Sequence, residues 1–186
     1  MIKGKLIVID PGHSGIPDPG AIGEKYKEST LAWKISCKVE EILMLRWGAR
    51  VIKTKQSEND PTSDSLSSRY NKANNAEADL FVSIHLNSAV NRSATGTETF
   101  FYPGSVKGAK LAACIQDQLV ACMGLSNRGC KLANFTVLKY TQMPAALTEV
   151  GFISNFDEEM YIADNLDKAA EAIAQGIVDY FYIWEV

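Results

Sequence analysis

Apolar residues in this chain fall into two patterns: short continuous runs, which are typical of buried strands, and runs at helical spacing. The first continuous run, Leu6-Ile7-Val8-Ile9, is rich in β-branched residues and is stopped by Asp10-Pro11-Gly12. It predicts a buried parallel strand that leads into a loop. The loop is long and rich in glycine, and it extends to about residue 27.

A helical pattern begins at about Glu28, and its apolar residues are Leu31, Ile35, Val39, Ile42 and Leu43. Gly48 is placed to end this helix, and Ala49 to Thr54 follow as a second strand. The order strand, helix, strand predicts a βαβ unit.

The same alternation continues to the C-terminus. The patterns predict helices over 65–78 and 106–123, strands over 80–84, 97–102, 136–139 and 145–150, and a C-terminal helix. In that last helix one face carries Ala170, Ile173, Ile177, Tyr180, Phe181 and Trp184. The expected fold class is α/β: a three-layer αβα domain with a mostly parallel (mixed) central sheet of about six strands flanked by helices.

Length and composition limit the possible classes of protein. A chain of 186 residues that is 46% hydrophobic can bury one sizeable core, so we expect residues 1–186 to form a single domain. The formal net charge is -3, and no Lys/Arg run could follow a phosphate backbone, so nucleic acid is not an expected partner. The four cysteines show no C-x-x-C spacing and are expected to be free thiols.

The apolar run near the N-terminus, Leu6 to Ile9, is far too short for a signal peptide or a membrane span. We therefore expect neither an export signal in these residues nor membrane insertion.

The chain has only two histidines, and each follows a predicted core strand: His13 comes shortly after Ile9, and His85 directly after Ile84. Sites in open α/β sheets form beyond the carboxyl ends of the strands, so the two imidazoles could converge there. A catalytic zinc site commonly uses two imidazoles and a carboxylate. From the residues alone, the carboxylate could be Glu28, Glu24 or Asp18, and an acid in the first turn of a helix, such as Glu28, needs no further role.

Glu149 is a second acid of interest, because it ends an apolar predicted strand and is followed two residues later by Gly151. A charge in that position is costly unless it is paired, functional or emerging into solvent. The residues alone favour a catalytic role and simple solvation about equally.

Several motifs occur in a fixed order over nearly the whole chain. They are Ile9-Asp10-Pro11-Gly12-His13, Gly20-Ala21-Ile22-Gly23, Lys27-Glu28, Leu66-Ser67-Ser68-Arg69, Ala73-Asn74, Ala78 through Asn87, Gly96-Thr97-Glu98, Asn127-Arg128-Gly129, Val137-Leu138 and Pro144 through Asn155. On these motifs the chain resembles the zinc-dependent N-acetylmuramoyl-L-alanine amidases of the type 3 amidase family.

The resemblance implies a metal site and a reaction. By position, the zinc ligands of the family fall on His13, Glu28 and His85, and its catalytic glutamate falls on Glu149. The implied activity is zinc-dependent hydrolysis of the amide bond between N-acetylmuramic acid and L-alanine in bacterial peptidoglycan, with no other cofactor.

Two more candidate residues and two departures from the family pattern follow from the resemblance. Asn87 and Arg128 are candidates for substrate binding. The sequence departs from the family pattern at Gly15-Ile16-Pro17 and at Thr54-Lys55, where the family often has a Thr-Arg pair. Neither departure falls on a ligand, so we expect it to affect loop shape and substrate fit.

Two other functions are compatible with the sequence: a zinc peptidase of similar fold that acts on another amide, and a wall-binding module without activity. As an amidase acting at the bacterial cell wall, the chain would be either a phage endolysin released at lysis or the catalytic module of an autolysin. A separate wall-binding domain is plausible in both settings.

Overall fold

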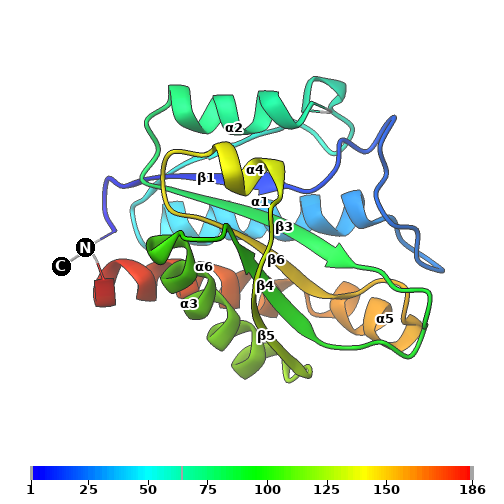
Figure 1. The fold of residues 1–186 in the computed structure, drawn as a ribbon. Helices are drawn as coiled ribbons and strands as arrows, with labels where there is room; N and C mark the ends of the chain where they lie inside the picture. The colour runs from blue at the N-terminus through cyan, green and yellow to red at the C-terminus, as the bar shows by residue number, and fades with distance from the viewer. Residues whose placement is uncertain (1, 64, 185–186) are drawn as a thin grey trace.

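The computed structural model describes residues 2–63 and 65–184, and these form a mixed six-stranded sheet with helices on both faces (Figure 1). The strand order is β2-β1-β3-β6-β4-β5. The strands are β1 (Leu6–Pro11), β2 (Arg50–Lys53), β3 (Leu80–Asn87), β4 (Thr97–Phe101), β5 (Asn127–Leu132) and β6 (Ala145–Phe152). Four of them, β2, β1, β3 and β6, are parallel, and β4 runs antiparallel to β6. The expected fold class is confirmed.

The helices cover the sheet in two layers (Figure 1). They are α1 (Glu28–Leu45), α2 (Leu66–Asn75), α3 (Val106–Met123), α4 (Thr136–Tyr140), α5 (Phe156–Asp164) and α6 (Leu166–Trp184), with a short 3-10 turn at Pro61–Ser63. Helices α1, α3 and α6 pack on one face of the sheet, and α2 and α4 on the other.

Strand β1 has an uninterrupted apolar sequence because helices cover both of its faces. Ile7 and Ile9 belong to the core that the sheet shares with α1, α3 and α6, whereas Leu6 and Val8 belong to the core under α2 and α4. Successive side chains in a strand point to opposite faces, so a strand covered on both faces needs apolar residues at every position.

One predicted strand is wrong, because Thr136–Tyr140 is the short helix α4. Val137 and Leu138 are adjacent in sequence and both are buried in the same core beneath α4. In a strand these neighbours would point to opposite faces of the sheet; in a helix both can face the core. The β-branched residues of this segment suggested a strand, but packing decided otherwise.

The sixth strand is instead β5, which the sequence analysis did not predict. Its residues, Asn-Arg-Gly-Cys-Lys-Leu, are mostly polar and none is buried. An edge strand with so little burial gives no apolar pattern by which to find it. Helix α5 was also not predicted.

The four cysteines are free. Among the described residues, the helices are all too short or too polar to span a lipid bilayer.

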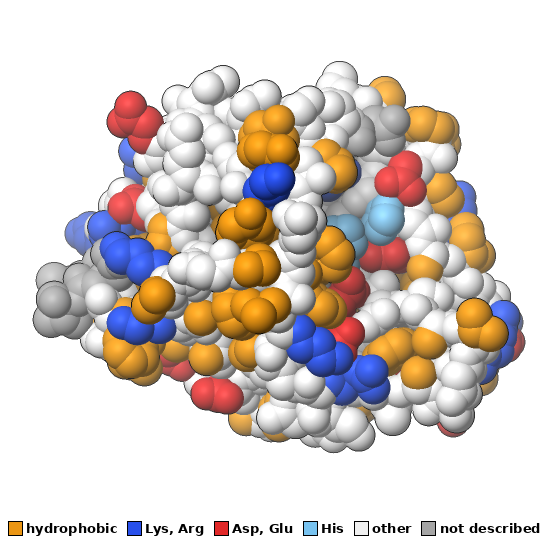
Figure 2. Space-filling model, in the orientation of Figure 1, with side chains coloured by type: hydrophobic (Ala, Val, Ile, Leu, Met, Phe, Trp, Pro, Cys, Tyr) orange, Lys and Arg blue, Asp and Glu red, His pale blue; other side chains and the backbone are white. Residues whose placement is uncertain are grey.

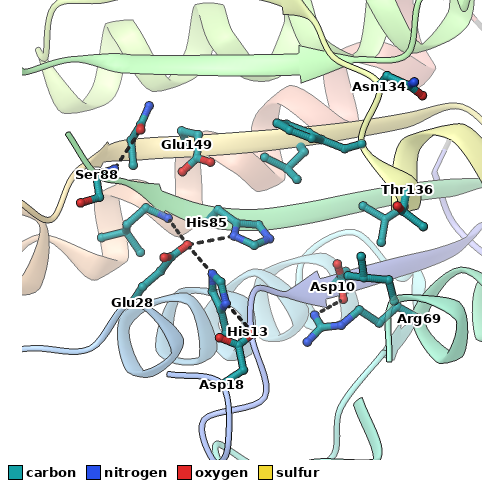
Figure 3. Close-up of a pocket in the computed structure, with 16 residues that line it drawn as sticks. Asp10, His13, Asp18, Glu28, Arg69, His85, Ser88, Asn134, Thr136 and Glu149 are labelled. Carbon is teal, nitrogen blue, oxygen red and sulfur yellow. Dashed lines mark hydrogen bonds and ion pairs between the residues drawn. The ribbon is translucent and has the colours of Figure 1, made fainter. Parts of the chain in front are cut away.

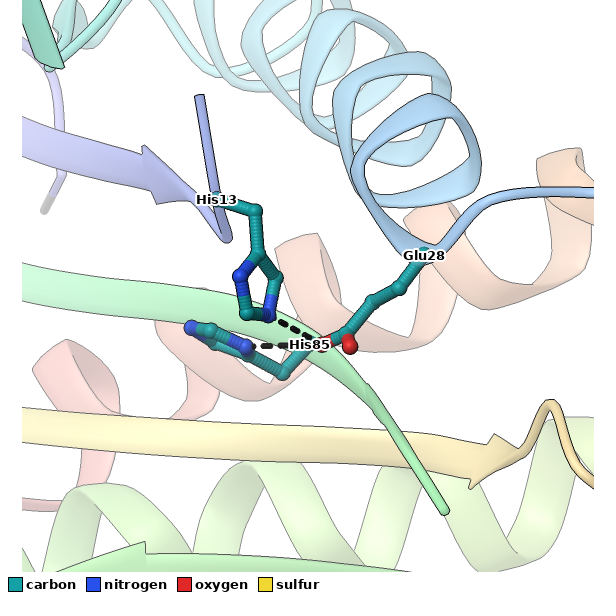
Figure 4. Close-up of side chains that lie close together, drawn as sticks. All are labelled: His13, Glu28 and His85. Carbon is teal, nitrogen blue, oxygen red and sulfur yellow. Dashed lines mark hydrogen bonds and ion pairs between the residues drawn. The ribbon is translucent and has the colours of Figure 1, made fainter. Parts of the chain in front are cut away.

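The two faces of the sheet determine which side chains of β3 can point toward the functional site. On β3, Leu80, Val82, Ile84 and Leu86 face α1 and α6, so Phe81, Ser83, His85 and Asn87 face α2 and α4. The carboxyl ends of β1, β3 and β6 lie side by side, and the start of α1 lies close to the same edge (Figure 4).

Candidate metal centre and active site

His13, Glu28 and His85 come together at this edge of the sheet (Figure 4). Nε2 of His13 lies 3.1 Å from Oε1 of Glu28, and Nδ1 of His85 lies 2.8 Å from the same oxygen. The two imidazole rings meet edge to face, with centroids 5.0 Å apart. One possible ligand atom from each residue lies within 4.8 Å of the other two. The structure therefore brings together the three residues that the resemblance implied as ligands.

His13 is held in an unusual backbone conformation, with a φ of 61°. Its Nδ1 lies 2.8 Å from Oδ2 of Asp18, so its Nε2 is turned toward Glu28. A carboxylate on the second nitrogen is the usual means of orienting a histidine ligand. Asp18, which the sequence left open as a ligand, serves as the partner of His13.

Glu28 is fixed by the backbone as well as by the two histidines. It is the first residue of α1 and is only 4% exposed. Its Oε2 accepts from the amide of Ala21 at 2.9 Å, and its Oε1 from the amide of Leu86 at 3.2 Å. Burial alone would raise the pKa of this carboxyl, but hydrogen bonds to His13 and His85 outweigh it, and the pKa lies well below its usual range.

The loop before Glu28 is shaped by a residue far away in the sequence. Glu159, fully buried on α5, accepts hydrogen bonds from the backbone amides of Glu24, Lys25 and Tyr26 at 2.7 to 2.9 Å. These bonds fix the path of the loop as it enters α1. Glu24, the other carboxylate left open by the sequence, has its side chain paired with Arg92 at 3.6 Å instead.

Two glycines allow the ligands to approach one another. A Cβ on Gly12 would lie 2.6 Å from the ring of His85. A Cβ on Gly20, whose φ is +70°, would lie 2.5 Å from the ring of His13 and 2.7 Å from Oε2 of Glu28. Any other residue at either position would displace His85, His13 or Glu28.

Glu149 lies beside the cluster on β6, in register with His85 of β3 and Glu98 of β4. Its Oε2 is buried and has no hydrogen-bond partner among the residues that the structure describes. Burial raises the pKa of this carboxyl well above its usual value, and the charges of Glu28 and Glu98 add to the effect. Figure 3 shows the carboxyl pointing into a cavity beside His85.

That cavity has a volume of about 470 Å³, which is within the usual range for small-molecule sites. Its wall includes the histidine cluster, Glu149 and Asn87, and an apolar side. The apolar side is formed by Leu66, Phe135, Val137 and Leu147. Small-molecule sites usually combine a few polar groups that meet at one point with apolar walls.

The donor set fits a divalent metal ion. Two imidazoles and one carboxylate are a common catalytic zinc set, which leaves a further position open. A cation at these donors would also stabilise the ionised form of Glu149. A positive charge at the cluster would therefore give Oε2 of Glu149, which has no hydrogen-bond partner among the described residues, a favourable electrostatic interaction.

Asn87 and Arg128, the two candidates for substrate binding, both contact Glu98. Nδ2 of Asn87 donates to Oε1 of Glu98 at 2.6 Å, and Nε of Arg128 donates to Oε2 at 2.7 Å. Lys131 also donates to Oε2. Burial alone would raise the pKa of Glu98, but Lys131 and Arg128 outweigh it and lower the pKa. Asn87 lines the cavity.

Sequence reasoning missed two parts of the site. One is Glu98, which is 5% exposed and organises the side of the site next to Glu149. The other is the buried pair of Arg69 and Asp10, in which Nη1 of Arg69 donates to Oδ1 of Asp10 at 2.8 Å. All three residues lie in the motifs quoted above, but a motif does not reveal which charges pair.

Lys55 bears on the metal centre although it is not a ligand. Its side chain is fully buried, and Nζ donates to the carbonyl oxygens of His13 at 3.1 Å and Glu58 at 3.2 Å. It thereby holds the loop that carries His13. The departure from the family pattern at Lys55 therefore lies at a residue that contacts the backbone of the candidate ligand His13.

Replacing Lys55 with methionine should lower the affinity for the metal about tenfold, since loss of outer-shell support typically costs 10- to 100-fold. The matched control is Lys53→Met: Lys53 is two residues away and also lies over the ring of Trp33, but it pairs with Glu40. Competitive titration against a chelator measures both affinities. Equal metal affinities for Lys55→Met and Lys53→Met would show that Lys55 does not support His13.

Comparison with known proteins agrees with this geometry. Residues 7–179 match the family model described as N-acetylmuramoyl-L-alanine amidase. The chain is 40% identical over 189 residues to the Bacillus subtilis protein YqiI, with 97% of this chain and 86% of YqiI covered. It is 38% identical to the N-acetylmuramoyl-L-alanine amidase LytC of the same organism, with 97% of this chain covered. The chain spans only about a third (36%) of LytC.

A solved structure shows the same fold. The N-acetylmuramoyl-L-alanine amidase from Clostridium difficile 630 superposes with a TM-score of 0.91 at 34% identity, covering 98% of this chain and 99% of that one.

Proposed function

The chain belongs to the N-acetylmuramoyl-L-alanine amidase family and is a peptidoglycan amidase, and we propose that it uses zinc held by His13, Glu28 and His85, with Glu149 as its catalytic acid–base group. The observation that carries this proposal is the convergence of two imidazole nitrogens on one carboxylate oxygen, at 2.8 and 3.1 Å. Beside them lies Oε2 of Glu149, a buried oxygen with no hydrogen-bond partner among the described residues.

Zinc, when bound, supplies a Lewis acid that activates water and polarises a carbonyl. Glu149 accepts a proton from the attacking water while the water oxygen bonds to the carbonyl carbon of the lactyl group of N-acetylmuramic acid. Glu149 then passes the proton to the α-nitrogen of L-alanine as the carbon–nitrogen bond breaks. The products are a carboxylic acid on the sugar and a free amine on the peptide.

Other residues hold the proposed zinc donors in position and shape the cavity. Glu28 is held by two backbone amides, and His13 by Asp18, so the donors need little reorganisation on binding zinc. The apolar wall, which includes Phe135 and Leu147, offers a surface on which the apolar parts of the substrate can pack.

The products formed on purified cell wall test the function. With zinc, the protein should release new L-alanine α-amines and no new reducing sugars. The same preparation with Glu149→Gln is the control. New amines from another residue would favour a zinc peptidase. Binding of wall without any turnover would favour a wall-binding module.

We also propose that residues 1–186 act as one catalytic domain and that a separate wall-binding domain can accompany them, as in an autolysin or a phage endolysin. Measuring wall affinity of these residues alone tests this: weak binding with retained turnover is expected.

A further inference from the structure

A row of charged side chains crosses the sheet from the histidine cluster to its far edge. His85 on β3 is in register with Glu149 on β6, which is in register with Glu98 on β4. Residues in register on neighbouring strands lie on the same face of a sheet. Arg128 and Lys131 come from the last strand, β5, and reach Glu98.

Strand spacing gives the scale of this row. Neighbouring strands lie about 4.8 Å apart, so three spacings separate β3 from β5 by roughly 14 Å. In Figure 2 acidic and histidine side chains line a hollow, and Lys and Arg side chains lie at its lower edge. Neither Arg128 nor Lys131 is among the residues that line the cavity, so the two cations lie beside the active site without forming its wall.

Glu98 fixes the two cations without cancelling them. Its buried carboxylate pairs with both Arg128 and Lys131, so one negative charge faces two positive charges and the group keeps a net charge of +1. Asn87 occupies the other carboxylate oxygen.

Arg128 is also held from two other sides. Its Nη1 donates to the carbonyl oxygen of Thr95 at 3.3 Å, and its guanidinium lies 4.9 Å from the ring centroid of Phe152. Its Nη2 has no hydrogen-bond partner among the described residues. The side chain is 37% exposed, and that of Lys131 is 39% exposed. The result is a fixed guanidinium edge open to solvent, which suits a carboxylate.

We propose that Arg128 and Lys131 bind a carboxylate of the peptide stem, on the residue that follows L-alanine. The proposal rests on the proposed function, because it takes the scissile amide to lie at the histidine cluster. An extended peptide advances about 3.3 to 3.6 Å per residue, so a group on the second residue lies roughly 7 Å or more from the scissile bond. The side chains of Arg128 and Lys131 already reach Glu98, which is in register with Glu149, so they lie on the side of the site toward which such a group would extend. In peptidoglycan the second residue is a glutamate joined through its γ-carboxyl, which leaves its α-carboxylate free.

A pair of synthetic substrates tests this directly. Both are N-acetylmuramoyl-L-alanyl-γ-D-glutamyl-L-lysine amide, one with a free glutamate α-carboxylate and one with that group amidated. The zinc-loaded wild-type protein should show a KM about tenfold lower for the acid than for the amide. Arg128→Gln should raise the KM for the acid about tenfold, leave the KM for the amide unchanged and change kcat little. Lys131→Gln should act in the same direction with a smaller effect.

Arg92→Gln is the matched control, because Arg92 is 68% exposed and pairs with Glu24; it should keep the preference for the acid. Zinc content and thermal unfolding of every variant show whether the fold is retained. Wild-type protein with no preference, or a variant that raises both KM values equally, overturns the carboxylate site. If whole cell wall also yields no L-alanine amines, the proposed function fails as well, so the two failures can be told apart.

Discussion

Glu149→Gln should lower the rate of release of L-alanine amines from cell wall by about 10²- to 10⁴-fold, the usual contribution of a positioned acid–base group. Glutamine has the same shape as glutamate but cannot accept a proton. Zinc should stay bound, because Glu149 is not among the three donors. Stability without zinc should change little, since burial already favours the uncharged form of Glu149 and glutamine keeps the shape of the side chain.

Initial rates, zinc content and thermal unfolding measured on the same sample check this expectation. Glu24→Gln is the control, because Glu24 lies in the loop before Glu28 but outside the cavity; it should keep full activity. A Glu149→Gln protein that retains zinc and wild-type activity would remove Glu149 from the mechanism.

His85→Ala should lower the affinity for zinc by more than about 100-fold and abolish activity with it. The reason is that changes behind a ligand already cost 10- to 100-fold, and this change removes a ligand. It also leaves Oε1 of Glu28 with His13 as its one remaining imidazole partner.

Asp18→Asn is a control of intermediate effect for the zinc affinity of His85→Ala. Asp18→Asn removes only the carboxylate behind His13, so its loss of zinc affinity should lie between those of His85→Ala and the wild type. Affinities come from titration against a chelator. If His85→Ala bound zinc as tightly as Asp18→Asn, His85 would not be a ligand.

The candidate site was only partly predictable from the residues. His13 and His85 could be located because each follows an apolar run, and such runs form core strands. That their imidazoles meet depends on β1 and β3 being neighbours in the sheet, which no local pattern states. For Glu28, only the resemblance separated it from Glu24 and Asp18. In the structure Glu28 contacts His13 and His85. Glu24 pairs with Arg92, and Asp18 contacts His13 alone among the two histidines.

Some elements were hidden for physical reasons. Strand β5 is polar and exposed, so its place in the sheet comes from pairing with β4 and not from burial of its own side chains. Residues 136–139 have the composition of a strand, but they fold as helix α4 because Val137 and Leu138 both pack toward the same core.

The α/β layers and the strand ends could be recognised from the sequence, because burial on both faces of a sheet imposes a local apolar pattern. Which charges meet depends on the folded arrangement of the strands and loops. The strand order placed His85, Glu149 and Glu98 in one row, and Glu159, more than 130 residues away in sequence, shaped the loop before Glu28. Such pairings depend on the distance between side chains in the folded chain, and neither spacing nor composition records that distance.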